Sequence, residues 1–199
     1  MTIKRLSYWM SQPHFTDGNL IILYAIHTKS GATEAVPNHV RERVRVCIDM
    51  YRIIMTSKPD KNNTLVLVIV DDSSAPDIKK MLMKAGVDEN LVMLTASPRN
   101  VGQTFDYVLE FVQKRANPPY IYFVGSIWHK DIYDSVVLSK MKDYQTRFEG
   151  APDHRPVDDV AKEKALNMPT KGIEYYRGKL KNKAVDMVIN YIFPDDKKN

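Results

Sequence analysis

The side chains best suited to chemistry fall in three short polar segments of this 199-residue chain. They are HTKSGAT at residues 27–33, VDDSS at 70–74 and VGSIWH at 124–129. Together they offer hydroxyls and a glycine for contacts to an anion, paired carboxylates for sugar hydroxyls or a cation, and an imidazole for proton transfer. Each segment follows an apolar run, so all three are candidates for one ligand site.

The first segment combines small polar residues with a glycine. Thr28 and Ser30 supply hydroxyls, and Gly31 lets the backbone turn sharply and present N–H groups to an anion. The segment matches neither the Walker phosphate loop nor the GxGxxG pattern of dinucleotide-binding folds. We therefore treat Thr28, Ser30 and Gly31 as candidate ligand-binding residues, with an ordinary loop as the alternative.

The second segment places two carboxylates in succession. Asp71 and Asp72 can accept hydrogen bonds from sugar hydroxyls or hold a divalent cation through oxygen ligands. Asp72 or Ser73 can instead cap the helix that follows, an interaction worth about 1 kcal/mol. A capping role accounts for only one of the two aspartates, and the other is then available to a ligand. Asp71 is therefore the candidate catalytic carboxylate, and Asp72 and Ser73 are candidate ligand contacts.

The third segment brings a glycine, a serine and a histidine close together. Gly125 and Ser126 are candidate ligand contacts, and His129 is a candidate catalytic acid or base because histidine exchanges protons near neutral pH. The alternative is a structural His129 that hydrogen-bonds inside the fold. The sequence contains no GxSxG, HExxH or CxxC motif, so no reaction is assigned by a motif.

The single cysteine, Cys47, cannot form an intramolecular disulfide, and without a cysteine partner we expect no structural metal site. It lies at helical spacing from Val40, Val44 and Tyr51, which predicts a buried core thiol. No apolar run reaches the roughly 18 residues needed to span a bilayer, and the first residues lack the apolar region of a secretory signal. We expect a soluble, cytoplasmic protein with no membrane partner.

Charge indicates the kind of partner only weakly. The net charge is +5, and the apolar fraction of 44% and charged fraction of 27% are ordinary for a globular protein. Lysines gather only around residues 162–183 and at the C-terminal end, where aspartates interrupt them. This dispersed charge favours an ordinary solvated surface over a nucleic-acid groove, and nucleic acid stays open as a partner. A positive balance is equally expected of a protein that binds a phosphorylated or carboxylated small molecule.

Apolar periodicity predicts the elements that must position the three segments. Short apolar runs rich in β-branched residues predict strands, and apolar residues spaced by three and four predict helices. The predicted strands are residues 20–25, 65–70, 91–94 and 120–124, and the predicted helices are residues 36–55, 75–85, 101–115, 131–142 and 172–192. This alternation predicts an α/β, Rossmann-like three-layer domain with a mostly parallel sheet and helices on both faces.

The predicted organisation is a single domain over residues 1–199. Residues 1–18 are expected to form an N-terminal arm, and residues 150–199 a C-terminal helical appendage packed on the domain. In open parallel sheets, ligands bind beyond the carboxyl ends of the strands. All three polar segments follow predicted strands, so we expect them to converge on one crevice.

Four features in the same order resemble a known family. Arg43 precedes the tyrosine of the first helix by eight residues, and a later helix closes on a Gly-Val step in MLMKAGVDENLVML. Thr104 opens the next helix in RNVGQTFDYVLEF, and a strand then runs into V-x-S-x-x-H in VGSIWH. Over about residues 20–133, the pattern resembles the α/β family that includes YdcF, SanA and ElyC, the domain of unknown function 218.

The resemblance implies a Rossmann-like fold with a nucleotide-type pocket, and S-adenosylmethionine or a nucleotide as its cofactor. The site residues that it implies are Arg43, Thr104, Ser126 and His129. The chain departs from the family's glycine-rich turns at HTKSGAT and VDDSS, and Tyr107 and Ile132 stand where the family has asparagine and arginine. These departures remove hydrogen-bond donors for an anion.

The sequence therefore predicts a cytosolic domain that binds a nucleotide-like or S-adenosylmethionine-like small molecule, with any reaction unassigned. A divalent cation held by Asp71 and Asp72 stays open. The alternative is a non-catalytic interaction protein that uses the basic residues 162–183 against an acidic partner or nucleic acid.

Overall fold

The computed structural model describes residues 18–27, 35–57, 64–70, 73–96, 98–113 and 118–167. Internal contacts divide the chain into two units, residues 1–154 and 155–199, which are described separately. The predicted arm at residues 1–17 and the predicted helix at 172–192 lie outside the described residues. Of the predicted appendage at residues 150–199, residues 150–154 belong to the first unit, and the packing of residues 155–199 on the domain stays a prediction.

The first unit is built on one five-stranded sheet in which every pairing is parallel. The strand order is β3-β2-β1-β4-β5. The strands are β1 (Asn19–Tyr24), β2 (Thr64–Ile69), β3 (Val92–Thr95), β4 (Tyr120–Ser126) and β5 (Thr146–Ala151). The predicted α/β fold with a parallel sheet is confirmed.

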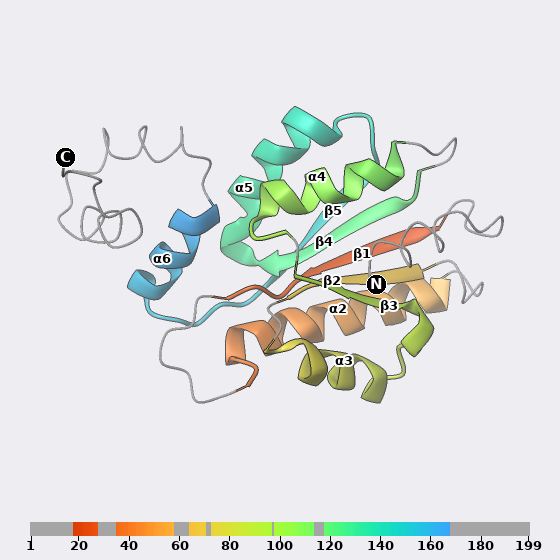
Figure 1. Cartoon of the computed structure of the whole chain (residues 1–199), viewed down its shortest axis with the longest axis horizontal. Helices are drawn as coiled ribbons and strands as arrows, with labels where there is room; N and C mark the ends of the chain where they lie inside the picture. Colours follow the sequence, from red (N-terminus) through yellow and green to blue (C-terminus); the bar gives the residue numbers. More distant parts are fainter. Residues whose placement is uncertain are drawn as a thin grey trace, which may run out of the picture. The chain divides into compact units, whose positions relative to one another are not determined.

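Helices cover both faces of this sheet (Figure 1). One face carries α2 (Asn38–Ser57) and α3 (Ala75–Lys84), and the other carries α4 (Val101–Val112) and α5 (Lys130–Val136). Short helical turns complete the unit: the 3₁₀ turns η2 (Glu89–Leu91) and η3 (Ile127–His129), and the π-helical η4 (Val137–Met141). The described helices and strands lie within a few residues of their predicted positions, except for β5 and for α6 (Val157–Asn167), at neither of which an element was predicted.

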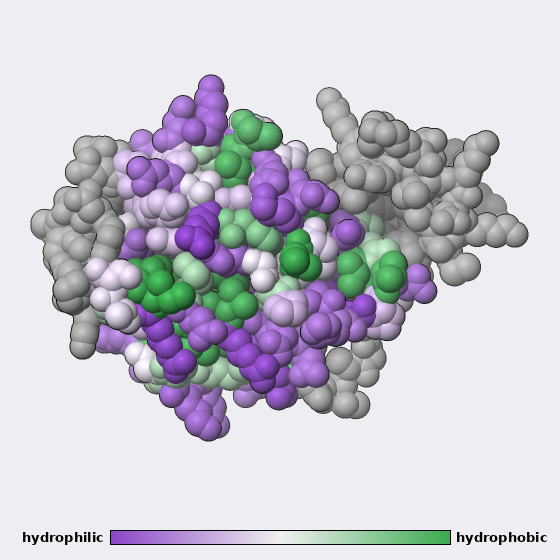
Figure 2. All heavy atoms as spheres, turned by 180° about the vertical axis from the view of Figure 1, so that it is seen from behind, coloured by the Kyte–Doolittle hydropathy of each residue, from purple (hydrophilic) through white to green (hydrophobic). Residues whose placement is uncertain are grey.

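Side chains of β1 alternate between two apolar cores. Leu20, Ile22 and Tyr24 pack on the side of α4 and α5, whereas Leu23 and Ala25 pack on the side of α2 and α3. A strand buried on both faces reads as a continuous apolar run, which explains why LIILYA was recognisable in the sequence. On the face shown in Figure 2, apolar residues form small groups separated by polar ones.

The two ends of α3 are stabilised in different ways. Gly86 has a φ of 93°, the Gly86 N–H donates to the carbonyl of Met83, and the Val87 N–H donates to the carbonyl of Leu82. This pattern is a Schellman motif, which favours glycine at this place. At the other end the N-cap is Ser74 rather than Asp72 or Ser73, and the Ser74 hydroxyl donates to the carbonyl of Ala35 instead of capping the helix.

β5 was not predicted from the sequence. Its segment TRFEGA has one large apolar residue, Phe148, and of its six residues three are half-buried, two are exposed and only Ala151 is buried. β5 pairs with β4 alone, at the edge of the sheet, so a continuous apolar run is not needed there. Edge strands of this kind carry little of the hydrophobic signal on which sequence-based prediction depends.

The second unit contains α6 (Val157–Asn167) among the described residues. Asp158 and Asp159 lie in its first turn, where acidic side chains interact favourably with the helix dipole. Arg155 and the buried Glu163 form an ion pair at 2.6 Å, which ties the segment before the helix to its middle. Of the helices in the described part of the chain, none has both the length and the apolarity to cross a membrane.

Cys47 provides a direct test of the α2 packing. The residue is fully buried, and burial raises the pKa of its thiol to about 12. At pH 8, only about one thiol in ten thousand would then be ionised, and the thiolate is the nucleophile. We expect a thiol reagent at pH 8 to leave the native protein unlabelled and to label one site per chain in urea. Rapid labelling of the native protein would show that Cys47 is not in the core.

Candidate functional site

The sheet has a single point at which the order of its strands reverses. From β1 the chain moves outward to β2 and β3, and it then crosses to the other side of β1 to form β4 and β5. In open parallel sheets, such a switch point leaves a crevice beyond the carboxyl ends of the two central strands, and ligands bind there. The candidate site therefore lies beyond the ends of β1 and β4.

The two central strands part at this edge. Their pairing ends with Leu23 opposite Val124. Beyond that pair, β1 continues beside β2, where the Ala25 N–H donates to the carbonyl of Ile69, and β4 continues beside β5 as far as Ser126. A wedge-shaped gap in the hydrogen-bond ladder follows from this divergence.

The guanidinium of Arg43 lies in this gap. Its Nη1 donates to the carbonyl oxygens of Ile26 at 2.9 Å and Tyr24 at 3.3 Å, and its Nε donates to Oγ of Ser126 at 2.8 Å. One side chain from α2 thus joins the end of β1 to the end of β4. Arg43 has no exposed surface, so its contacts in the structure are with protein groups.

Asp153 supplies the opposite charge. Its Oδ2 lies 3.9 Å from Nη2 of Arg43 and accepts hydrogen bonds from the Ser126 hydroxyl at 2.8 Å and from Nε1 of Trp128 at 3.0 Å. The carboxylate side chain is 1% exposed. Ser126 accepts a hydrogen bond from the arginine and donates one to the carboxylate, so it relays the interaction between the two charges.

Isolated charges this deep in a protein are strongly unfavourable. The ion pair and the hydrogen bonds that Arg43 and Asp153 make with protein groups offset this cost, but a buried pair of this kind is a weak source of net stability. Its clearer consequence is positional, because the cluster fixes the carboxyl ends of β1 and β4 and the segment that follows β5. We call the four residues Arg43, Ser126, Trp128 and Asp153 the arginine cluster.

His129 lies beside the arginine cluster on the other face of the sheet. Its Nδ1 is 3.2 Å from the carbonyl oxygen of Ser126. A carbonyl only accepts, so this contact assigns the proton to Nδ1. The ring meets Tyr24 edge-on with centroids 5.0 Å apart, stacks on Trp128 at 3.7 Å, and is fully buried.

Gly125 makes room for the imidazole. A Cβ atom at this position would come within 3.0 Å of Cε1 of Phe123 and 3.1 Å of Nδ1 of His129. The glycine in VGSIWH therefore has a packing reason: it lets the His129 ring lie against the backbone of β4.

Other predicted site residues are placed differently. Thr104 is buried in the first turn of α4, and its hydroxyl donates to the carbonyl of Asn100, the N-cap residue of the helix, at 2.9 Å. Ser73 is exposed in the turn before α3. The remaining candidates lie outside the described residues: Thr28, Ser30, Gly31, Asp71 and Asp72. The assignment of all these residues to a ligand stays a prediction.

Asp153 was missed because nothing in the local sequence sets it apart from other surface acids. The signal that could have found it lies on α2. Arg43 falls on the apolar stripe formed by Val40, Val44 and Cys47, whereas most arginines of the helix lie on its polar side. An arginine in an apolar stripe requires a buried acidic partner, and that requirement does not say which acid supplies it.

A metal centre gains no support from the part of the chain that the structure describes. Within those residues, no three histidine, cysteine, aspartate or glutamate side chains are close enough to hold a metal ion. Two histidines come near each other at the end of β1 and the start of α2, where the rings of His27 and His39 lie 6.1 Å apart.

Comparison of the chain with protein-family models, with curated proteins and with solved structures finds no match in any of the three. The geometry of the site therefore stands by itself as the basis for a functional proposal.

The arginine cluster predicts strong coupling between its two charges. Asp153→Ala leaves a buried guanidinium without its counter-charge, so we expect a loss of about 3–5 kcal/mol in the free energy of unfolding, measured in urea. The double variant Arg43→Met with Asp153→Ala should be destabilised by at least about 1 kcal/mol less than the sum of the single variants. The control Asp134→Ala, in an exposed pair with Lys130, should lose less than about 1 kcal/mol. Additive single effects would contradict the cluster.

Two glycine substitutions should act in opposite directions. Gly125→Ala forces Cβ against Phe123 and His129 and should destabilise the protein by about 1–3 kcal/mol. Gly102→Ala in α4 places Cβ at an ordinary 3.4 Å from Oδ1 of Asn100 and should stabilise it by about 0.5–1 kcal/mol, because alanine is the better helix former. Thermal or urea unfolding measures both. Equal effects would show that His129 does not pack on Gly125.

Proposed function

We propose that this chain is a cytosolic domain that binds a nucleotide-like small molecule at the carboxyl edge of its sheet. The observation that carries the proposal is the reversal of strand order between β1 and β4, with the ends of both strands fixed by the buried arginine cluster. A switch point in an open parallel sheet is the usual ligand site of such folds.

The arginine cluster suits the role of a framework beneath a ligand. A binding site loses affinity when it must order its own groups on binding, so rigid supports favour affinity. Arg43 holds the carbonyl of Ile26, which directly precedes the segment HTKSGAT, and Ser126 lies at the start of the segment SIWH. Arg43 therefore holds the residue directly before one polar segment and a residue within another.

Within the proposal, each segment has a chemical role. The carboxylates of Asp71 or Asp72, which directly follow Val70 at the end of β2, accept ligand hydroxyls or hold a divalent cation, as in the sequence-based expectation. Thr28, Ser30 and the Gly31 backbone contact anionic oxygens. His129 is buried beneath the site and supports it through its hydrogen bond to the carbonyl of Ser126.

We further propose that the resemblance to the YdcF, SanA and ElyC family reflects a shared architecture. The structure offers a reason why some of the shared residues occur together: Arg43 and Ser126 are hydrogen-bonded, and the backbone of Ser126 contacts His129. A spacing of V-x-S-x-x-H lets one serine serve the cluster on one face and the histidine on the other. Family members with the same trio are expected to show the same contacts.

A ligand screen by thermal shift tests the function. The wild-type protein is heated with ADP, AMP, S-adenosylmethionine or a nucleotide sugar, with and without Mg²⁺ or Mn²⁺. A ligand at a hundred times its Kd stabilises the fold by about 2.7 kcal/mol, which for a chain of this size raises Tm by roughly 5–10 °C.

A matched pair of carboxylate variants localises the binding. Asp71→Asn is expected to weaken the ligand at least tenfold without lowering the Tm of the ligand-free protein. Asp131→Asn, an exposed carboxylate in the first turn of α5, should leave affinity unchanged. If none of the ligands raises the wild-type Tm by more than about 1 °C at millimolar concentration, the proposal fails.

A further inference from the structure

A shallow depression lies between the start of α2 and the exposed side of α3. Its volume is about 320 Å³. Ala35, Val36 and Arg41 form one wall, and Lys80 and Lys84 of α3 line the other together with Asp77 and Met81. Small-molecule sites span about 300–1,000 Å³, so this depression suits a part of a nucleotide rather than the whole.

The charges that line the depression are mostly positive. Arg41, Lys80 and Lys84 are cationic, and Asp77 is the one acid among the lining residues, which gives a balance of three positive charges to one negative. Nε of Arg41 donates to the carbonyl of Val36 at 2.9 Å, and this bond holds the guanidinium at the wall.

The two lysines stand one helical turn apart on the same side of α3. Like charges at this spacing repel each other by about 0.2–0.5 kcal/mol. Among the residues that the structure describes, neither Lys80 nor Lys84 makes an ion pair, whereas the neighbouring Lys79 pairs with Glu89. A bound anion would reduce the repulsion between Lys80 and Lys84.

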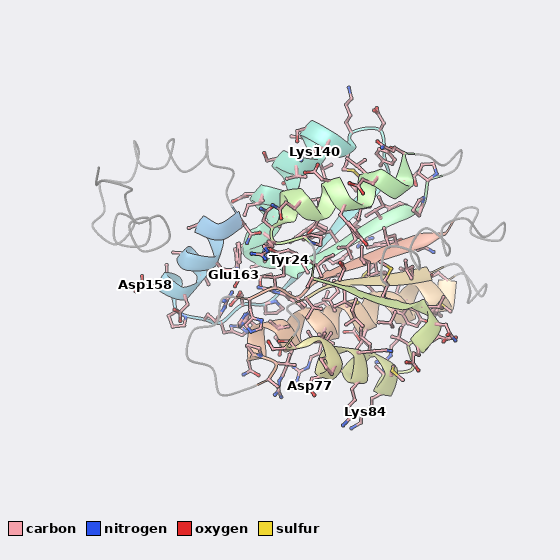
Figure 3. All side chains as sticks on the ribbon, in the orientation of Figure 1. Tyr24, Asp77, Lys84, Lys140, Asp158 and Glu163 are labelled. Carbon is pink, nitrogen blue, oxygen red and sulfur yellow. The ribbon has the colours of Figure 1, made fainter. Side chains whose placement is uncertain are left out.

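The depression adjoins the carboxyl edge of the sheet. The Ser74 hydroxyl donates to the carbonyl of Ala35 at 3.0 Å, so the segments that follow β1 and β2 are joined at its rim. Figure 3 shows Asp77 and Lys84 on α3 at the lower margin of the first unit, while Lys140 projects from the opposite side. In Figure 2, polar residues likewise project at the margin where α3 lies.

We infer that this depression binds the phosphate groups of the ligand, contacted by Arg41, Lys80 and Lys84. The inference rests on the proposed function and narrows it: the ligand is a phosphorylated nucleotide-like molecule rather than a nucleoside or S-adenosylmethionine. Three cations around a depression of this size match a diphosphate, whose oxygens can accept from several donors at once.

Calorimetric titration of the full chain with ADP, AMP and adenosine tests the inference. We expect ADP to bind at least tenfold more tightly than adenosine at 50 mM salt, and this ratio to shrink at 300 mM salt because exposed charges are screened. Lys80→Gln combined with Lys84→Gln should weaken ADP at least fivefold and leave the affinity for adenosine within twofold.

The matched control combines Lys140→Gln with Lys142→Gln. It removes the same two charges from the opposite side of the sheet, where Lys140 pairs with Asp106 of α4. Its ADP affinity should stay within twofold of wild type. An equal loss of affinity in both double variants would mean that net charge alone attracts the anion, and the inference would be overturned.

The remaining outcomes separate this inference from the proposed function. Equal binding of ADP and adenosine, with no effect of the Lys80 and Lys84 substitutions, overturns the phosphate site but leaves a ligand site at the sheet edge. Absence of binding by all three compounds overturns both. Tighter binding of a short single-stranded DNA than of ADP, weakened in the Lys80 and Lys84 variant, would replace the nucleotide with nucleic acid.

Discussion

The hydrogen bonds of the Arg43 guanidinium hold together the part of the fold where β1 and β4 separate. A parallel sheet that reverses its strand order must leave such a separation, because its central strands carry their chains away in opposite directions. Arg43 joins the end of β1 to Ser126 of β4, and Asp153 balances its charge from the segment after β5. The end of one helix, two strands and one loop therefore depend on a single side chain.

The two sides of the sheet use this edge differently. On the side of α2, the buried charges of the arginine cluster occupy the gap. On the other side, His129 and Tyr24 close it with aromatic contacts, and the Nδ1 of His129 is directed to the Ser126 carbonyl. Ser126 takes part in both through its hydroxyl and its carbonyl. Ser126 and His129, two of the candidate site residues from the sequence, are thus held in place by contacts on both sides of the sheet.

Helix α2 combines two roles through the spacing of its arginines. Arg43 points into the core and fixes the strand ends, whereas Arg41, two residues earlier, is exposed at the wall of the depression beside α3. Residues two apart on a helix face different directions. One turn of helix therefore connects the buried arginine cluster to the surface depression beside α3.

The sequence by itself determined the elements whose signal is local. Two strands were predicted from the continuous apolar runs LIILYA and LVLVIV, because a strand buried on both faces has apolar residues throughout. Helix α2 was predicted from the apolar stripe around Cys47, because a helix buried on one side has apolar residues spaced by three and four. The position of VGSIWH at the end of a strand followed from the same alternation, whereas the strand order that puts it at the switch point came from the structure. Only the tertiary structure decided the edge strand β5, the pairing of Arg43 with Asp153, and the placing of the lysines of α3 beside Arg41. Those features join residues far apart in the chain, and contacts of that kind leave no periodic trace in the sequence.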